Sequence, residues 1–130
     1  MQKNNFYWLL ILIFLLTCCF NNNPKTTQAI FSVAKDTIDF KFRDKNQTTL
    51  IPIMVSNVGS ANLKIINIKG SCGCTDIKFD TAAIKPGGNS TILLNYKSSG
   101  DTIPVLKNIV VETNATPSLK VIFFRGTYEC

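Results

Sequence analysis

From residue 30 onward, the sequence is built from short runs in which apolar and polar residues alternate. Residues 38–42 read Ile-Asp-Phe-Lys-Phe and residues 92–96 read Ile-Leu-Leu-Asn-Tyr, so every second position of both runs is apolar. Successive side chains of a strand point to opposite faces, and this alternation therefore indicates strands with one buried face. The pattern predicts a half-buried strand at each of these two places.

Other runs predict further strands, two of them irregular. Residues 48–55 are rich in β-forming residues but include Pro52, which favours an edge strand or a bulge because proline lacks a backbone N–H. The apolar positions slip out of alternation near Ile66, which predicts a bulge there. Residues 106–113 and 119–127 are expected to form the last pair of strands.

Turn residues separate these runs. Lys-Pro-Gly-Gly at residues 85–88 is the strongest turn signal, since proline presets φ and glycine supplies the positive φ that follows it. We therefore expect Pro86 and Gly87 to shape this loop. We also expect Gly73 to shape the loop between two cysteines, because a residue without a Cβ permits a positive φ and so allows a sharp bend.

The strand pattern predicts the fold class. No run after the N-terminal segment has a 3.6-residue apolar period long enough for a helix. Roughly seven to nine short strands predict an all-β fold, a single immunoglobulin-like antiparallel β-sandwich. Antibody domains pack a core tryptophan, but Trp8 is the only tryptophan here and it lies in the N-terminal segment. We expect aliphatic residues and phenylalanines to fill the core instead.

The N-terminal segment has the pattern of an export signal. One positive charge, Lys3, precedes an unbroken apolar run at residues 6–16, which is shorter than the roughly 20 residues needed to span a bilayer. The polar stretch that follows has nothing to bury. We therefore predict a lipoprotein-type signal peptide at residues 1–18, a flexible tether at residues 19–29 and the sandwich domain at residues 30–130.

The apolar run ends on two cysteines, as in a bacterial lipoprotein signal, where the cysteine after the cleavage site carries the lipid. Cys19 is the favoured lipidation site because Thr17 and Cys18 place smaller side chains before it, and Cys18 is the alternative. A secretory leader without lipid and an uncleaved anchor are the other interpretations. The favoured one predicts an exported protein, held by its lipid on a membrane of the bacterial cell envelope and facing the periplasm or the cell surface.

Charge and composition exclude several classes of function. The chain has 14 Lys and Arg against 8 Asp and Glu, a net charge of +6, but the basic residues are scattered and form no stripe that could follow phosphates. We therefore expect no nucleic acid partner. Histidine is absent, which removes the commonest general base, and no nucleotide-binding motif occurs. The expectation is a protein that is not an enzyme and has no cofactor.

The densest chemical motif is Ser-Cys-Gly-Cys-Thr, which contains Cys72 and Cys74. Their thiols can form a structural disulfide or a redox pair, or can stay free. They can also bind Cu(I), or zinc with further ligands from Asp76, Asp80 or Cys130. Residues two apart lie near the upper end of the Cα separations that a disulfide tolerates, so we expect a strained ring.

Redox centres usually lie at a helix N-terminus or beside cations that lower the thiol pKa, whereas this motif is predicted to lie in a loop between strands with only Lys69 and Lys78 nearby. Apart from Cys72, Cys74 and the two lipidation candidates, the chain has one further cysteine, Cys130, as the last residue. This cysteine can link two molecules as a disulfide-bonded dimer, pair with Cys72 or Cys74, or remain free. The sequence leaves these alternatives open.

A longer set of positions matches a bacterial pattern. These positions are Asn57, Gly59, Leu63, Ile65, residues 71–75, Ile84, Pro86, Gly87, Ile92, Leu94, Tyr96, Lys107, Ile109, Val111, Asn114 and Gly126. In this set the chain resembles a family of bacterial envelope proteins known as a domain of unknown function, DUF1573. The resemblance implies an exported or lipid-anchored domain with an immunoglobulin-like fold, similar to domains of pilus chaperones and sperm-protein-like modules. It implies no biochemical activity.

Two functional hypotheses follow. The first is a non-enzymatic module that binds another envelope protein or peptide, because exposed edge strands can accept an added strand from a partner. The second, from a different class, is a thiol redox or metal-binding protein, with copper or zinc as the metal, that uses Cys72 and Cys74. A purely structural role in the envelope, without a specific partner, is the third alternative.

Overall fold

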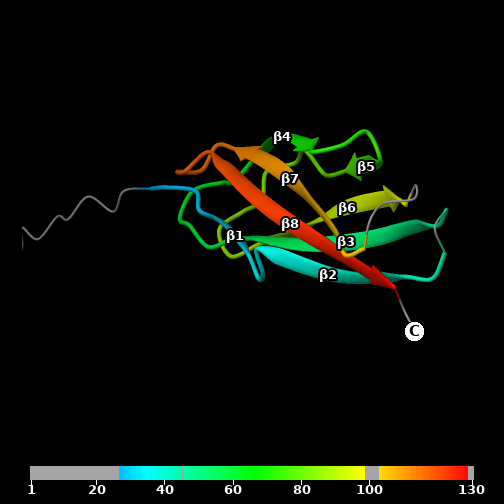
Figure 1. Cartoon of the computed structure of the whole chain (residues 1–130). Coiled ribbons are helices and arrows are strands. Elements are labelled where there is room, and N and C mark those ends of the chain that lie inside the picture. The colour runs from blue at the N-terminus through cyan, green and yellow to red at the C-terminus, as the bar shows by residue number, and fades with distance from the viewer. Residues whose placement is uncertain (1–26, 45, 99–102, 129–130) are drawn as a thin grey trace, which may run out of the picture.

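The computed structural model describes residues 27–44, 46–98 and 103–128 (Figure 1). The predicted signal peptide, both candidate lipidation cysteines, most of the tether and Cys130 lie outside these ranges. The described residues include no helix that is long and apolar enough to cross a membrane. They form the strands β1 (Phe31–Val33), β2 (Thr37–Phe42), β3 (Thr48–Asn57), β4 (Ile65–Gly70), β5 (Thr75–Lys78), β6 (Asn89–Lys97), β7 (Val105–Thr113) and β8 (Leu119–Tyr128).

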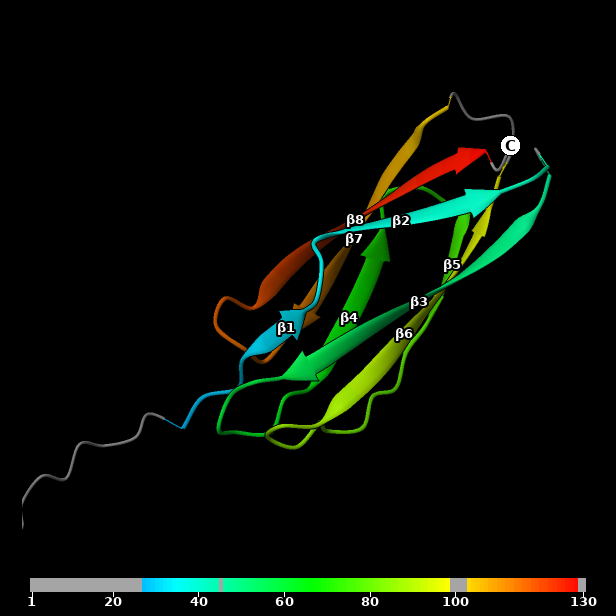
Figure 2. The same cartoon turned by 90° about the horizontal axis from the view of Figure 1, so that it is seen from below.

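The strands form two four-stranded sheets that pack as a sandwich (Figure 2). Sheet A has the order β1-β3-β6-β5, and sheet B has the order β2-β8-β7-β4. The prediction of an all-β sandwich is confirmed, and the number of strands falls within the predicted range. The pairs are antiparallel, with one departure from the prediction: β2 and β8 run parallel.

The parallel pair follows from the path of the N-terminal chain, which crosses from one sheet to the other. Strand β1 pairs with the end of β3 in sheet A, and after a short connection the chain continues as β2 beside β8 in sheet B. Both β2 and β8 then run away from the end at which the chain enters. Alternation within a strand cannot reveal this, because it identifies the buried face of a strand and not its neighbours.

Pro52 lies in β3, which has a neighbour on both sides over only part of its length. Strand β1 pairs with residues 55–57, so the rest of β3 has an open edge within the described residues. On this side the N–H of Val58 donates to the Ile30 carbonyl (3.0 Å), and every second residue back along β3, Pro52 included, faces the same way. Pro52 therefore lies at an edge, and its missing N–H removes no hydrogen bond to β6.

The bulge predicted near Ile66 is confirmed. The pairing of β4 with β7 shifts register between Ile65 and Asn67. The shift leaves Ile66 exposed while Ile65 and Ile68 both face the core. The inward positions predicted for β6 are buried as well.

Aliphatic side chains and a small group of aromatic rings fill the space between the sheets, as expected for a domain without a core tryptophan. Phe40, Tyr96 and Phe124 contact one another, with ring centroids 5.4, 5.9 and 6.1 Å apart. Gly126 makes room for the rings, because a Cβ there would lie 2.5 Å from Cζ of Phe40 and 2.9 Å from Cε1 of Phe42. Any other residue at this position would displace the aromatic group.

A buried asparagine connects three segments at the end of the sandwich where the described chain begins. The side-chain amide of Asn57 donates to the carbonyls of Ala61 (2.7 Å) and Ile84 (2.9 Å). Its side-chain oxygen accepts from the N–H groups of Gly59 (3.0 Å) and Ile30 (3.4 Å). The residue is fully buried, and both polar atoms of its side chain have two partners. This complete pairing makes the burial of an amide tolerable.

The first described residues are held against the same end. The carbonyl of Gln28 accepts from the N–H groups of Ser60 (2.8 Å) and Ala61 (3.2 Å), and Ala29 is buried. A Cβ on Gly59 would collide with the Gln28 carbonyl, so only glycine fits this close approach. Gln28 and Ala29, which the sequence places at the end of the tether, thus pack against the domain.

The turn predicted at residues 85–88 is confirmed. The N–H of Gly88 donates to the Lys85 carbonyl (2.8 Å), and Gly87 has a φ of 76°, the positive value that a type II turn requires after proline. The N–H of Gly87 also donates to the backbone carbonyl of Asn57 (2.8 Å). The turn therefore belongs to the end of the sandwich that the buried asparagine holds together.

Replacing Asn57 with aspartate should destabilise the domain strongly. The carboxylate keeps the shape of the amide but replaces its N–H donors with an acceptor that faces the Ala61 and Ile84 carbonyls. A buried polar group without a partner costs about 1–3 kcal/mol, so the free energy of unfolding at neutral pH should fall by at least about 2 kcal/mol. Urea denaturation followed by circular dichroism measures the change.

Asn89→Asp is the matched control, because Asn89 is exposed at the start of β6. Its free energy of unfolding should stay within about 0.5 kcal/mol of the original value. An Asn57→Asp variant as stable as this control would show that the four hydrogen bonds of Asn57 do not hold this end of the domain together.

Candidate functional site

The cysteine motif lies where the chain crosses from sheet B to sheet A. Residues 71–74, which we call the cysteine corner, connect β4 at the edge of one sheet to β5 at the edge of the other. The N–H of Ser71 donates to the Asn108 carbonyl (3.0 Å), and its hydroxyl accepts from the Asn108 N–H (3.2 Å). At the other end, the Cys74 carbonyl accepts from the N–H of Lys97 (3.0 Å). The corner is thus fixed on both sides by neighbouring strands.

Cys72 and Cys74 are joined by a disulfide. Their Cα atoms lie 5.3 Å apart, well within the range for disulfides, so the expectation of a separation near its upper end is wrong. The chain bends between the two cysteines and shortens the distance. Gly73 does not use the positive φ that glycine permits, and a Cβ there would meet no atom within 4 Å. The bend is therefore made without the conformational freedom of glycine.

The last residue of the motif places a hydroxyl beside both sulfur atoms. Oγ1 of Thr75 lies 3.6 Å from Sγ of Cys72 and 3.9 Å from Sγ of Cys74. A disulfide sulfur carries no proton, so the threonine hydroxyl is the donor and a sulfur the acceptor. The sulfur atoms thus have a polar hydrogen within reach.

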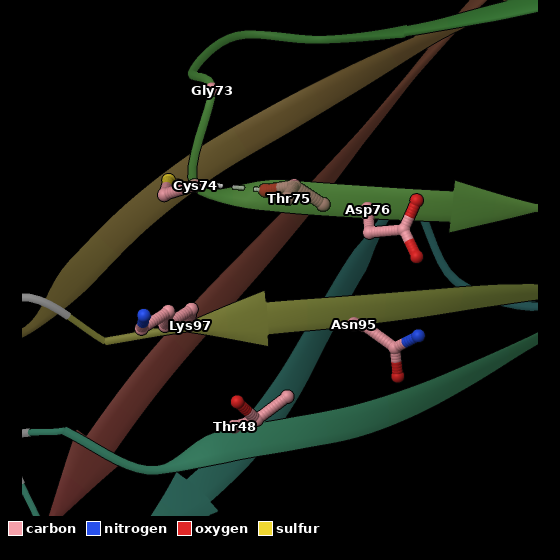
Figure 3. A pocket seen from close by; sticks show the side chains of 7 residues that line it. All are labelled: Thr48, Gly73, Cys74, Thr75, Asp76, Asn95 and Lys97. Atoms are coloured by element: carbon pink, nitrogen blue, oxygen red, sulfur yellow. Dashed lines mark hydrogen bonds between the residues drawn. The ribbon is translucent and has the colours of Figure 1, made fainter.

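An open groove of about 650 Å³ lies beside the cysteine corner, on the outer face of sheet A (Figure 3). Its walls come from the neighbouring strands β5, β6 and β3 and from the corner itself. The lining residues are Thr48, Gly73, Cys74, Thr75, Asp76, Asn95 and Lys97. Strand register explains this grouping, because Thr48 lies opposite Lys97 and Asp76 lies opposite Asn95.

The groove is polar and carries both signs of charge. Figure 3 shows Asp76 and Asn95 on neighbouring strands, with Lys97 beside Cys74. The ammonium group can donate hydrogen bonds, the carboxylate can accept them, and the amide can do both. The surface can therefore bond to the backbone and the charged groups of another chain.

Lys97 is a site residue that the sequence did not reveal. Along the chain, Lys69 and Lys78 are the cations nearest to the cysteines, whereas Lys97 is far away. The antiparallel pairing of β5 with β6 brings Lys97 next to Cys74. The alternation of β6 does place residue 97 on the outward face, but it does not tell which strand will be its neighbour.

The other candidate residues do not join this site. Oδ1 of Asp80 accepts from the N–H of Ala82 (2.8 Å) in the loop after β5. Pro86 and Gly87 lie at the opposite end of the sandwich, and Cys130 lies outside the described residues. Within the described ranges, no group of three or more His, Cys, Asp or Glu side chains is arranged to hold a metal ion.

An exposed ion pair links β2 and β8 on the outer face of sheet B. Nε of Arg125 donates to Oδ1 of Asp39 at 2.6 Å. This hydrogen bond lowers the pKa of Asp39 and raises that of Arg125. The side chains are 62% and 52% exposed, so solvent screens the pair and it adds little to stability.

Solved structures share this fold at low sequence identity. A protein of unknown function from Porphyromonas gingivalis W83 matches with a TM-score of 0.65 and 16% identity, over 83% of this chain and 50% of that chain. This chain thus spans about half the length of that protein. The ASH / PapD-like domain of human CEP192 (PapD-like domain 7) matches with a TM-score of 0.59 and 10% identity, over 82% of this chain and 88% of that one. Such low identities show a common fold alone, which is PapD-like and immunoglobulin-like.

Sequence comparison assigns the family. Among curated proteins, none is similar enough to this chain to count as a match. The model of a family described as protein of unknown function (DUF1573) matches residues 31–128. The match includes the buried Asn57, the cysteine corner and Gly126, and it covers well over half of the sequence. The chain therefore belongs to the DUF1573 family.

Proposed function

We propose that this protein is a lipoprotein of the bacterial cell envelope, tethered through a lipid on Cys19, whose sandwich binds another envelope protein or peptide without catalysing a reaction. The binding surface is the groove beside the cysteine corner. The observation that carries the proposal is the position of the groove, at the far end of the domain from the point where the chain enters.

Strand β3 spans the distance between these two ends. Its first residue, Thr48, lines the groove, and its last residue, Asn57, bonds to Ile30 near the chain entry. Ten residues at about 3.3 Å each place the two ends roughly 30 Å apart. The chain enters at one end of the domain, which leaves the groove free to meet a partner at the other.

The chemistry of the groove suits a peptide segment. Small-molecule sites are mostly enclosed and apolar, with few polar groups. This groove is open, and its polar groups come from three strands that are fixed by their register. A rigid surface of this kind can bind without a large cost in conformational entropy, since its strands are ordered before the partner arrives.

Tagged full-length protein should recover a reproducible partner from detergent-solubilised envelopes of its host, and Lys97→Glu should reduce the recovery at least about tenfold. The substitution replaces the cation of the groove with a second anion near Asp76, so it reverses the charge that a partner meets. Quantitative mass spectrometry of cross-linked eluates measures the change.

Lys85→Glu is the matched control. It makes the same change of charge on an exposed lysine, but in the turn at the opposite end of the sandwich. Recovery of the partner should stay at its original level. Loss in both variants or in neither would contradict binding at the groove, and failure to recover any reproducible partner would contradict the function itself.

Cys19→Ser should remove a lipid-sized mass from the mature N-terminus, whereas Cys18→Ser should retain it. The lipid is attached to the cysteine that becomes the first residue after cleavage, so only one of the two substitutions removes the acceptor. Intact mass spectrometry of the membrane-purified protein distinguishes them. The reverse result would assign the lipid to Cys18. If the protein without substitutions carries no lipid-sized mass at its N-terminus, the lipid tether is ruled out.

A second function, thiol–disulfide exchange at the cysteine corner, is favoured by the position of Lys97. This lysine lies beside Cys74 in the groove, and the Thr75 hydroxyl is within 3.9 Å of both sulfur atoms. A nearby cation stabilises the thiolate that is released when a disulfide is reduced. The open groove also gives an external thiol access to Cys74.

In such an exchange, an external thiolate attacks one sulfur, the bond between Cys72 and Cys74 breaks, and the other sulfur leaves as a thiolate. A second external thiolate then attacks the mixed disulfide. Two external thiols are thereby oxidised to a disulfide, while both cysteines of the corner are reduced. The groove would hold the thiol-bearing partner during these two steps.

Cys72→Ser should abolish exchange with glutathione and leave the fold intact, because a bridge between residues two apart closes too short a loop to restrict the unfolded chain. Lys97→Met should slow the exchange severalfold at neutral pH, since the released thiolate loses its cation. Gly73→Ala, whose Cβ meets nothing, should react at the original rate. Stopped-flow kinetics measure these rates. Unfolding of Cys72→Ser would instead indicate a structural bridge.

A further inference from the structure

Each sheet has two edges, and three of the four edges are interrupted or short. In sheet A, one edge consists of β1, with only 3 residues, and of the open part of β3, in which Pro52 interrupts the row of N–H donors. The other edge of sheet A is β5, which has only 4 residues. In sheet B, the bulge at Ile66 disrupts β4. Irregular or short edges of this kind resist pairing with a further strand.

The fourth edge, β2, is uninterrupted. Thr37–Phe42 contains neither proline nor glycine, and its register with β8 continues without a shift over all 6 residues. Within the described part of the chain, β2 pairs with no strand on its other side. This edge is therefore the longest regular one that the sandwich offers.

One hydrogen bond fixes which backbone groups of β2 are open. The N–H of Phe123 donates to the carbonyl of Asp36 (2.7 Å), just before β2 begins. Alternate residues of a parallel strand bond to its neighbour, so the even-numbered residues of β2 face β8. The N–H and C=O groups of Thr37, Asp39 and Lys41 consequently face away from the sheet. They have no partner among the described residues.

The charge pattern of β2 is complementary to a second copy of the same strand. Asp39 and Lys41 are exposed on the outer face, and Phe40 between them is buried. If two copies pair antiparallel with Asp39 opposite Lys41, the junction contains two pairs of opposite charge, because each aspartate faces the lysine of the other copy. In each pair, the backbone N–H of one residue donates to the backbone carbonyl of the other. We propose that two copies of this chain associate through β2 in this register, which joins two four-stranded B sheets into one continuous sheet.

The competing registers and the contacts of Asp39 both favour this register. The two neighbouring registers of the same edge place Asp39 opposite Asp39 or Lys41 opposite Lys41, and like-charge repulsion disfavours both. Within its own chain, Asp39 uses Oδ1 to bind Arg125, so Oδ2 is available to Lys41 of the second copy. Because β2 is only 6 residues long in each chain, the interface is small, and the dimer population should depend on concentration.

Analytical ultracentrifugation of the full-length protein in density-matched detergent tests the proposal. The original protein should pass from monomer to dimer as its concentration rises. Lys41→Asp and Asp39→Lys each place like charges opposite one another, so each should weaken the dimer at least about tenfold. When the two variants are mixed in equal amounts, a heterodimer should form, because every aspartate then faces a lysine.

Lys69→Asp is the control, since it reverses an exposed charge on β4 at the opposite edge of the same sheet, and it should dimerise like the original protein. Amide hydrogen exchange gives a second readout, in which Thr37, Asp39 and Lys41 gain protection as concentration rises. A protein that stays monomeric, a dimer that Lys41→Asp does not weaken, or a mixture that forms no heterodimer would overturn the proposal. None of these results depends on the partner of the groove.

Discussion

The buried amide of Asn57 is the interaction on which the arrangement of the domain depends. Its four hydrogen bonds join the entering chain, the turn after β3 and the loop before β6. Loops as irregular as these cannot satisfy their backbone groups among themselves, and one side chain supplies the missing partners. With this end held together, β3 and β6 run in a defined register to the other end, where Thr48 and Lys97 meet across the groove.

The positions that carry the family resemblance form two groups: those that the fold requires and those that it does not. Asn57, Gly59 and Gly126 are required by the fold, through buried hydrogen bonds in the first case and close packing in the others. The cysteine motif has no such explanation, because Gly73 needs no special backbone conformation and a bridge between residues two apart hardly constrains the unfolded chain. A motif that the fold does not require is a reasonable place to look for function, and here it borders the groove.

Strands and bulges could be predicted from the sequence because both depend on which side chains are buried. The alternation of β6 and the slip at Ile66 are of this kind. The parallel pairing of β2 with β8 and the position of Lys97 beside Cys74 could not be predicted, since they depend on which strands become neighbours across long separations. The backbone conformation of Gly73 could not be predicted for another reason: glycine permits a positive φ but does not impose one.

The path of the N-terminal chain also has a mechanical consequence. The chain enters beside Asn57 and then runs lengthwise through the domain. It first forms β1, which pairs with β3, and then forms β2, which pairs with β8. A pull on the entering chain is therefore directed along the strands, so it loads the hydrogen bonds of each ladder together in shear and does not open them one after another. Tension between an anchor at one end and a bound partner at the other would act in the direction in which paired strands resist separation best.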